Sequence, residues 1–349
     1  GPIMEASDIH SALIKMGYRL KDFGNHWRTN ALYRGGENPT ALLIYKDSGV
    51  WTDFVKNTPS MPFKELVSAT IKSNDSGDIS KYIKGSLDTL SNAHVEKISS
   101  EKIYPDSVLE KLLPHYSFYE SRGVDKDVLI NLKSGLATEG SMLQRYVFPI
   151  YNELGQIHGF SGRDMNPNPN KDRPKWKHVG RKTNWIYPCF VKSDGDFKFL
   201  DSIRQSKEVF LIESIGDLLA LHSAGIFNCI PIFGTSISSK LLCFLLSLDL
   251  DMIHISLNND FDKDKNRGEI GAIKNLSKMS NYFDKHKLSM HLPTKNDFGD
   301  MNTAEIYEWD ERKPTASNIS SDIVQKSKSL LKNGDINSSC YKKIEKTFI

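Results

Sequence analysis

The amino-acid sequence predicts a multidomain protein of mixed α/β and α+β class, in which a small mixed module and an antiparallel hairpin precede a parallel sheet. Three observations predict this. The chain has 349 residues, enough for more than one hydrophobic core. Strand and helix patterns alternate from residue 208 to residue 292, which is typical of a parallel sheet covered by helices. Two apolar runs near residue 150 flank a short turn, which is typical of a hairpin.

The composition is that of an ordinary globular protein, with 39% hydrophobic and 26% charged residues. No apolar run reaches the roughly 18 residues of a membrane span, so we expect no membrane partner. No secretory leader is visible, and the four cysteines include no C-x-x-C pair. This indicates a reduced, cytoplasmic setting and predicts no zinc. The net charge of +3 does not by itself indicate a nucleic-acid partner.

The first half of the chain carries both helix-like and strand-like patterns of apolar residues. Residues 73–98 are rich in Ser, Asp, Asn and Gly, which is typical of a linker, and residues 105–134 contain two helical stretches. The basic segment 164–183 is rich in Pro and Asn and is expected to be a loop. The other expected elements are a helix over 7–16, strands over 42–45 and 49–51, a helix over 62–71, and hairpin strands over 147–151 and 156–160.

The second half has the rhythm of a parallel sheet. The last 39 residues are rich in Lys and Ser; there we expect one helix over 321–331, with the rest loosely held. The expected strands are 208–212, 229–233, 252–257 and 288–292, and the expected helices are 216–224, 236–246 and 268–283.

Acidic side chains follow three strands of this expected sheet. Ligands bind at the carboxyl ends of strands in an open parallel sheet, so these side chains are expected to meet there. Their mutual repulsion would be relieved by a divalent cation, and oxygen ligands favour Mg²⁺ or Mn²⁺. The alternative is that each acidic residue only caps the helix after its strand. The residues are Glu213 and Asp217, then Asp260, Asp262 and Asp264, and then Asp297 and Asp300.

These segments resemble a known family. Glu213-Ser214-Ile215-Gly216-Asp217, followed by an Ala-Gly and a Gly-Thr step, resembles the first motif of the TOPRIM domain of DnaG-type primases. Asn259-Asp260-Phe261-Asp262 resembles that domain's Asp-x-Asp motif, and 295–300 resembles its third acidic motif. The resemblance implies metal-dependent nucleotidyl transfer. It implies catalytic roles for Glu213, Asp217 and Asp260, and Mg²⁺ or Mn²⁺ binding by Glu213, Asp260, Asp262, Asp297 and Asp300.

The second motif departs from the family pattern, because the segment before Gly268 is longer than Asp-x-Asp-x-x-Gly. Two registers are therefore open. The pair is either Asp260 with Asp262, or Asn258 with Asp260. In the second register the first ligand is a neutral amide, which would hold a metal more weakly. Asp260 belongs to both registers, and Asp264 belongs to neither.

The basic segment 163–182 contains seven Lys or Arg and two Asp, and Trp176, Trp185 and Tyr187 lie in or just after it. Cations beside aromatic rings suit phosphates and stacked bases, whereas the alternative is a solvated loop whose rings pack on the core. Segments 118–124, 148–163 and 174–187 resemble the RNA polymerase core of DnaG-type primases. The resemblance implies that template DNA or NTPs are bound by Arg163, Lys175, Lys177, Arg181 and Lys182.

The resemblance also implies a domain division. Residues 1–80 would form a degenerate, zinc-ribbon-like module, since no cysteine precedes Cys189 and His26 is a lone candidate ligand. DNA contacts in this module would come from 33–36, Lys46 and Trp51; the alternative is a folding adaptor without DNA contact. The remaining divisions are a linker over 81–104, a polymerase-core subdomain over 105–200, a TOPRIM domain over 201–305 and a C-terminal tail over 306–349.

The expected function is that of a DNA primase, which makes short RNA primers from NTPs on single-stranded DNA. Alternatives are a TOPRIM nuclease, which needs no nucleotide-binding hairpin, a topoisomerase, which needs a tyrosine nucleophile, or a catalytically weak single-stranded-DNA-binding replisome protein. No P-loop motif is present, so a separate replicative helicase is the expected partner, with a contact in the basic tail unless that tail is merely solvated. Beside the family it resembles, the chain's compact size and missing zinc ligands imply a phage or mobile-element origin, and a setting in the bacterial host cytoplasm if the protein is phage-encoded.

Overall fold

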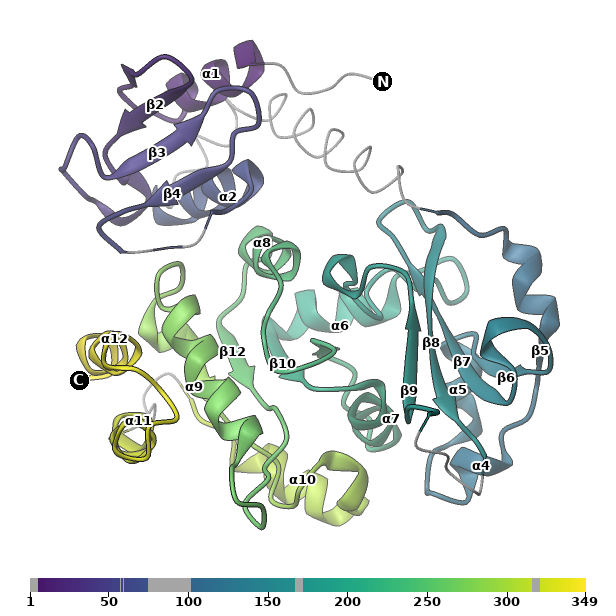
Figure 1. Ribbon diagram of the computed structural model, residues 1–349. Helices are drawn as coiled ribbons and strands as arrows, with labels where there is room; N and C mark the ends of the chain where they lie inside the picture. The colour runs from purple at the N-terminus through teal and green to yellow at the C-terminus, as the bar shows by residue number, and fades with distance from the viewer. Residues whose placement is uncertain (1–5, 57, 59, 75–101, 167–171, 316–320) are drawn as a thin grey trace. The chain divides into compact units, whose positions relative to one another are not determined.

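The computed structural model describes residues 6–56, 58, 60–74, 102–166, 172–315 and 321–349 (Figure 1). The chain divides into two compact units. The first is drawn from residues 1–100 together with 239–248, and the second from 101–238 together with 249–349. The linker expected over 81–104 lies outside the described residues up to residue 101. Among the described residues, no helix combines the length and apolarity that crossing a membrane requires.

The first unit is built on a four-stranded antiparallel sheet in the order β1-β2-β3-β4. Its core includes Leu42, Ile44 and Trp51, which alternate inward along β3 and β4 and are fully buried. Trp51 and Tyr33, which the sequence offered as DNA contacts, are both buried in this core. The elements are α1 (Ala6–Lys15), β1 (Lys21–Asp22), β2 (His26–Thr29), β3 (Leu42–Tyr45), β4 (Trp51–Asp53), α2 (Phe63–Asn74) and α8 (Ser239–Ser247), which packs on α2.

The second unit begins with a five-stranded antiparallel sheet in the order β5-β6-β7-β8-β9. The expected hairpin is confirmed as β7 (Arg145–Tyr151) and β8 (Ile157–Asp164). The segment 164–183, expected to be a loop, instead contains the edge strand β9 (Trp176–Val179), which pairs with β8. The remaining elements here are β5 (Leu112–Leu113), α4 (Ser117–Glu120), α5 (Lys126–Asn131) and β6 (Gly135–Ala137).

A four-stranded parallel sheet in the order β11-β10-β12-β13 forms the centre of the second unit and confirms the expected fold class. Its central strands are mostly apolar and buried, as strands covered on both faces are, apart from the partly buried Glu208 and the buried His254. The elements are α6 (Lys198–Ser206), β10 (Glu208–Ile212), α7 (Ile215–Ser223), β11 (Cys229–Pro231), β12 (Met252–Ile255), α9 (Arg267–Met279) and β13 (Leu288–Met290).

Three helices complete the unit: α10 (Thr303–Glu311), α11 (Ser321–Lys332) and α12 (Ser338–Phe348). The helix expected over 321–331 is confirmed as α11. The expectation that the chain after α11 is loosely held is wrong for α12, which packs on both α11 and α9 and buries Ile344 fully (Figure 1). Asn337 begins α12 by accepting a hydrogen bond from the Cys340 amide at 2.8 Å.

Candidate active site

The carboxyl edge of the parallel sheet brings Glu213 and Asn258 together. Glu213 follows β10 and Asn258 follows β12, and these two strands are paired in parallel, with Leu211 opposite Ile255. The Asn258 side-chain amide donates a hydrogen bond to Glu213 Oε2 at 2.9 Å. The ends of β10 and β12 therefore lie at one edge of the sheet, and the residue beside Glu213 is an amide rather than a carboxylate.

This contact favours the second of the two registers, with Asn258 and Asp260 as the pair. Gly268 supports it, because a Cβ there would lie only 1.6 Å from the Asn258 carbonyl oxygen. The backbone of α9 thus approaches the end of β12 as closely as a glycine allows. The extra residues bulge out between these two fixed points. Asp262 lies in this bulge and accepts a hydrogen bond from the Asn296 side chain at 3.1 Å.

Asp260 is buried, with 8% of its surface exposed. Its Oδ1 lies 3.2 Å from Lys263 Nζ, and its Oδ2 accepts a hydrogen bond from the Gly268 amide at 3.4 Å. Its own backbone N–H donates to Asn266 Oδ1 at 2.9 Å, and the same oxygen caps α9. Asp260 is thus held in place from several directions, as a ligand-binding group requires.

Asp217 links the first acidic segment to the third. It closes a capping box with Ser214 at the start of α7, and its Oδ1 accepts a hydrogen bond from the Phe298 amide at 3.1 Å. Asp297 in turn caps the short turn after it by accepting a hydrogen bond from the Asp300 amide at 2.9 Å. The helix-capping alternative therefore applies to Asp217 and Asp297, which also shape the site.

Burial, together with the nearby charges of Asp217 and Asp260, raises the pKa of Glu213 to about 7. Burial and the charge of Asp297 likewise raise the pKa of Asp217 to about 6. The pKa of Asp297 is raised by burial and then by Asp300. These carboxylates repel one another near neutral pH, so a cation at this edge would be bound favourably.

The donor atoms fit a hard divalent cation in part. Glu213 Oε1 and Asn258 Oδ1 are buried and have no hydrogen-bond partner among the described residues. Both are oxygen donors of the kind that Mg²⁺ and Mn²⁺ take. Within the described residues, however, no three His, Cys, Asp or Glu side chains are grouped closely enough to hold a metal together. An ion here would rely on one or two carboxylates, with amide, water or phosphate oxygens completing its shell, as is common for Mg²⁺.

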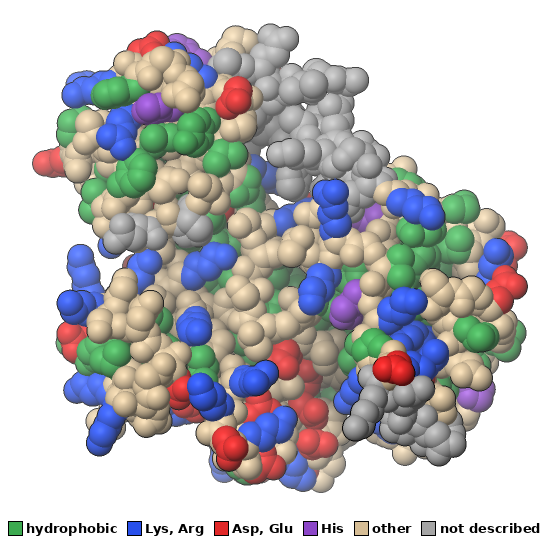
Figure 2. Space-filling model, viewed as in Figure 1, with side chains coloured by type: hydrophobic (Ala, Val, Ile, Leu, Met, Phe, Trp, Pro, Cys, Tyr) green, Lys and Arg blue, Asp and Glu red, His purple; other side chains and the backbone are tan. Residues whose placement is uncertain are grey.

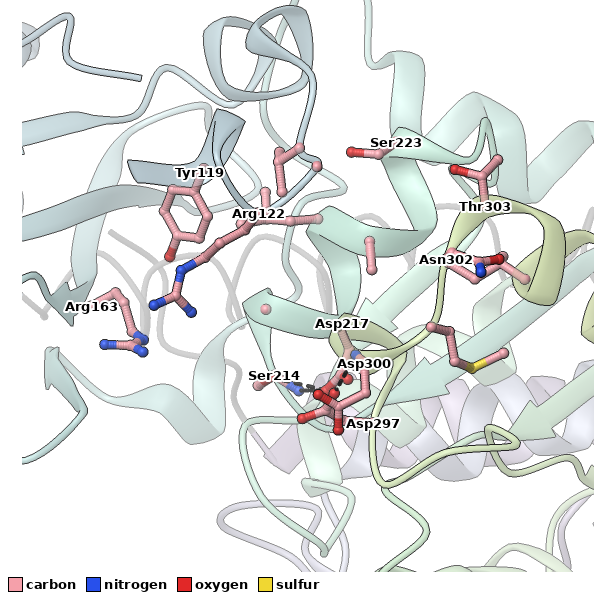
Figure 3. A pocket seen from close by; sticks show the side chains of 18 of the residues that line it. Tyr119, Arg122, Arg163, Ser214, Asp217, Ser223, Asp297, Asp300, Asn302 and Thr303 are labelled. Carbon is pink, nitrogen blue, oxygen red and sulfur yellow. Dashed lines mark hydrogen bonds between the residues drawn. The ribbon is translucent and has the colours of Figure 1, made fainter. Parts of the chain in front are cut away.

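A cavity of about 550 Å³ adjoins the acidic edge (Figure 3). One wall carries Ser214, Asp217, Asp297, Asp300 and Asn302, from the start of α7 and the third acidic segment. The opposite wall comes from α4, β8 and β9 and carries Tyr119, Arg122, Arg163, Lys175 and Trp176. Figure 2 shows Asp and Glu side chains, with Lys and Arg among them, gathered over the lower part of the second unit. The cavity thus places cations opposite carboxylates.

Arg122 and Arg163 share the ring of Phe118, since their guanidinium carbons lie 4.2 and 5.6 Å from its centroid. Burial, together with the charge of Arg122, lowers the pKa of Arg163. Within the described part of the chain, neither arginine forms an ion pair with a carboxylate. Lys175 lies near enough to Asp297 to lower its pKa. The wall therefore offers cationic groups to an anionic ligand.

The other predicted binding residues lie elsewhere. Lys177 does not line the cavity and donates to the Ser141 carbonyl at 2.8 Å. Arg181 and Lys182 follow β9, are exposed and do not line the cavity either. Trp185 and Tyr187 are buried, as the alternative of core packing expected, whereas Trp176 does reach the cavity.

Sequence reasoning missed Arg122 as a site residue. Its signal was present, because Arg122-Gly123 belongs to a segment that already resembled the polymerase core. Lys263 was also missed. A lysine between two aspartates in the lengthened second motif is typical of a solvated loop. Only the structure shows that the Lys263 side chain lies beside Asp260.

Comparison with known proteins shows which class of fold the chain has. No family model matches the chain. A crystal structure of the zinc-binding and RNA polymerase domains of the Aquifex aeolicus primase shares its fold, with a TM-score of 0.50 and 15% identity over 98% of this chain and 96% of that one. The chain therefore has a fold of the primase class, with antiparallel sheets and a parallel sheet.

The chain is also similar in sequence to curated bacterial proteins. A DNA primase of Listeria innocua is 32% identical over 134 residues, which is 36% of this chain and 20% of that protein. A DNA primase of Borreliella burgdorferi is 29% identical over 151 residues, which is 42% of this chain and 27% of that protein. Part of the chain is therefore similar in sequence to bacterial DNA primases, and the match spans only a fifth to about a quarter of their length.

Proposed function

We propose that the chain is a DNA primase that joins NTPs into short RNA primers on single-stranded DNA. The observation that carries this proposal is the cavity in which Arg122, Arg163 and Lys175 face Asp217 and Asp297. A nuclease needs the acidic edge but no cationic wall for an incoming triphosphate. The homology to bacterial DNA primases supports the same choice.

The proposed division of labour follows from the geometry. Glu213 would act in metal organisation or in proton transfer. In the second role, a pKa raised to about 7 suits it to accept the proton of an attacking 3′-hydroxyl near neutral pH. A bound Mg²⁺ or Mn²⁺ would supply positive charge to the phosphates and the attacking hydroxyl. Glu213, Asn258 and Asp260 would hold that ion, with Asp262, Asp297 and Asp300 further out. Asp217 is a positioning residue, because it fixes the third acidic segment through the Phe298 amide.

The cationic wall is proposed to bind the triphosphate and the template. Arg163, Arg122 and Lys175 would bind phosphate oxygens, and Trp176 offers a ring for a base. Lys177 in β9 and the exposed Arg181 and Lys182 after it lie outside the cavity, and we propose that they contact the template there. We assign residues 105–200 to the polymerase-core subdomain and 201–305 to a TOPRIM domain.

The N-terminal module, residues 1–80, is proposed to touch the template through the outward face of its sheet. Phe23 and Phe54 are about half exposed there, and the Arg28 guanidinium carbon lies 5.9 and 5.0 Å from their ring centroids. Exposed rings with a shared cation suit single-stranded DNA. The module is proposed to be zinc-less, since no cysteine precedes Cys189.

We also propose an origin, a cellular location and a partner for the protein. The missing zinc ligands favour a phage-encoded primase that works in the bacterial host cytoplasm with a separate replicative helicase. Residues 306–349 are the proposed helicase contact, and they include α11 and α12.

One experiment separates the proposed function from its alternatives. The protein is incubated with single-stranded DNA, labelled NTPs and Mn²⁺ or Mg²⁺, beside a reaction containing a chelator. Short RNA products that disappear with the chelator are the expected result. Shortened DNA would instead support the nuclease, and DNA binding without either product would support the replisome protein.

Arg163→Ala tests the cationic wall. Because a guanidinium on a phosphate forms charge-assisted hydrogen bonds, its loss is expected to raise the KM for NTPs by about tenfold. Steady-state primer synthesis at varied NTP concentration measures this. Arg204→Ala, which removes an exposed arginine from α6, is the matched control and is expected to leave KM unchanged. Equal KM values in the two variants would contradict the assignment.

A further inference from the structure

The loop over 261–266 is the feature that sets this acidic edge apart from the shorter motif it resembles. The loop leaves the carboxyl edge of the sheet after Asp260 and returns to it at Gly268. The Gly268 backbone lies so close to the Asn258 carbonyl that a side chain there would clash with it. The Lys263 amide donates to the Asp260 carbonyl at 3.1 Å, so the chain turns sharply back. This turn brings Lys263 Nζ to 3.2 Å from Asp260 Oδ1. The added residues therefore return a positive charge to the acidic edge.

The loop is braced on both sides of Lys263. Asp262 accepts a hydrogen bond from the Asn296 side chain at 3.1 Å. Lys265 Nζ lies 3.4 Å from Asp335, at the turn between α11 and α12. Asn266 Nδ2 donates to Asn259 Oδ1 at 2.8 Å. The Asp262 and Asn266 contacts hold the loop backbone, whereas the ion pair of the exposed Lys265 contributes little. Lys263 therefore projects from a fixed base although most of its side chain is exposed.

The net negative charge at the acidic edge is smaller than its carboxylates alone would give. Asn258 contributes a neutral amide beside Glu213, and Lys263 contributes a positive charge beside Asp260. Lys263 is also close enough to Glu213 to lower the pKa that burial and the two aspartates raise. The ammonium group thus acts on both carboxylates that are best placed to hold a divalent ion.

We propose that Lys263 is an internal counter-ion of the acidic edge: it occupies the Asp260 side of the cation site until a divalent ion displaces it, and so weakens divalent-ion binding. This inference rests on the proposed metal-dependent function. An ammonium group and a divalent ion repel each other, and they compete for the same carboxylate oxygens. The loop would then set the cation concentration at which the site fills, independently of the chemistry that follows.

The test compares Lys263→Ala with Lys265→Ala in the full chain, using Mn²⁺ alone as the probe and electron paramagnetic resonance to count free ion. Both lysines lie in the same loop and are about two-thirds exposed, so neither change should unfold the protein. Lys263→Ala is expected to bind Mn²⁺ about tenfold more tightly than wild type, from the loss of one repulsive charge near the ion. Lys265→Ala is expected to match wild type.

Thermal unfolding provides a second readout. Without cation, Lys263→Ala leaves Asp260 uncompensated and is expected to unfold at a lower temperature than Lys265→Ala, with the order reversed at saturating Mn²⁺. Unchanged, weaker or undetectable Mn²⁺ binding by Lys263→Ala would overturn the inference. Neither measurement contains DNA or NTPs. The proposed primase function can therefore fail in the primer assay while this inference stands, and the inference can fail while primers are still made.

Discussion

Glu213→Gln is expected to lower primer synthesis by about a hundredfold, the loss typical of removing a group that acts in proton transfer or charge stabilisation in the transition state. The substitution keeps the shape of the side chain and an oxygen that can accept the hydrogen bond from Asn258. It removes the one carboxylate at the end of β10 whose pKa is raised to about 7. Primer synthesis under saturating NTPs measures the loss.

The same variant should not be destabilised. Removing a charge from a crowded group of carboxylates relieves repulsion, so the unfolding temperature without cation is expected to stay level or rise. Glu139→Gln, which changes an exposed glutamate of the same unit, is the matched control and is expected to keep full activity. Wild-type activity in Glu213→Gln would refute its catalytic role.

Asp53→Asn is expected to destabilise the N-terminal module by about 3 kcal/mol, because it removes one partner of a buried charged pair. The Asp53 carboxylate is fully buried and accepts hydrogen bonds from Tyr33 at 2.6 Å and from Arg34 at 2.8 and 3.1 Å. It also accepts the backbone amides of Val55 and Lys56. Hydrogen–deuterium exchange of peptides from β3 and β4 is expected to speed up accordingly.

The pH dependence of this effect has a definite sign. Burial alone would raise the pKa of Asp53, but the hydrogen bonds from Arg34 and Tyr33 outweigh it and hold the pKa below its ordinary value. The stabilisation is therefore present above the ordinary carboxyl pKa and is lost as the pH falls through the lowered one. The difference between wild type and Asp53→Asn should shrink in acid. Asp22→Asn, at an exposed ion pair, is the control. Equal exchange in Asp53→Asn and wild type at neutral pH would contradict this account.

The parallel sheet was predictable because its strands are buried on both faces and its helices follow at regular intervals. The edge strand β9 was not, since all four of its residues are half-buried and show no alternation. The helix α12 is polar with one fully buried apolar residue, Ile344, so its pattern is weak without α9 and α11 to pack on. The cap at Asn337 was the signal that could have revealed it.

The sequence could predict which strand ends carry the site, but not which side chains contact one another there. That Glu213 and Asp260 would share one edge follows from parallel topology alone. Which residue stands beside Glu213 does not, because a loop of unknown path separates Asp260 from Gly268. The hydrogen bond from Asn258 to Glu213 and the close approach of Gly268 to Asn258 favour one register, and neither contact can be inferred from the sequence. The cationic wall likewise depends on segments around α4, β8 and β9 lining one cavity with the start of α7, which no local pattern encodes.

The central claim is that oxygen ligands from separate strands meet on one cation that serves RNA synthesis. Primer synthesis by Asp260→Asn beside wild type, over a range of Mg²⁺ concentrations, tests it most directly. Wild type is expected to make RNA products only when the cation is present. The variant is expected to make about a hundredfold less, as for other losses of transition-state charge stabilisation. Equal, cation-independent synthesis by both proteins would contradict it.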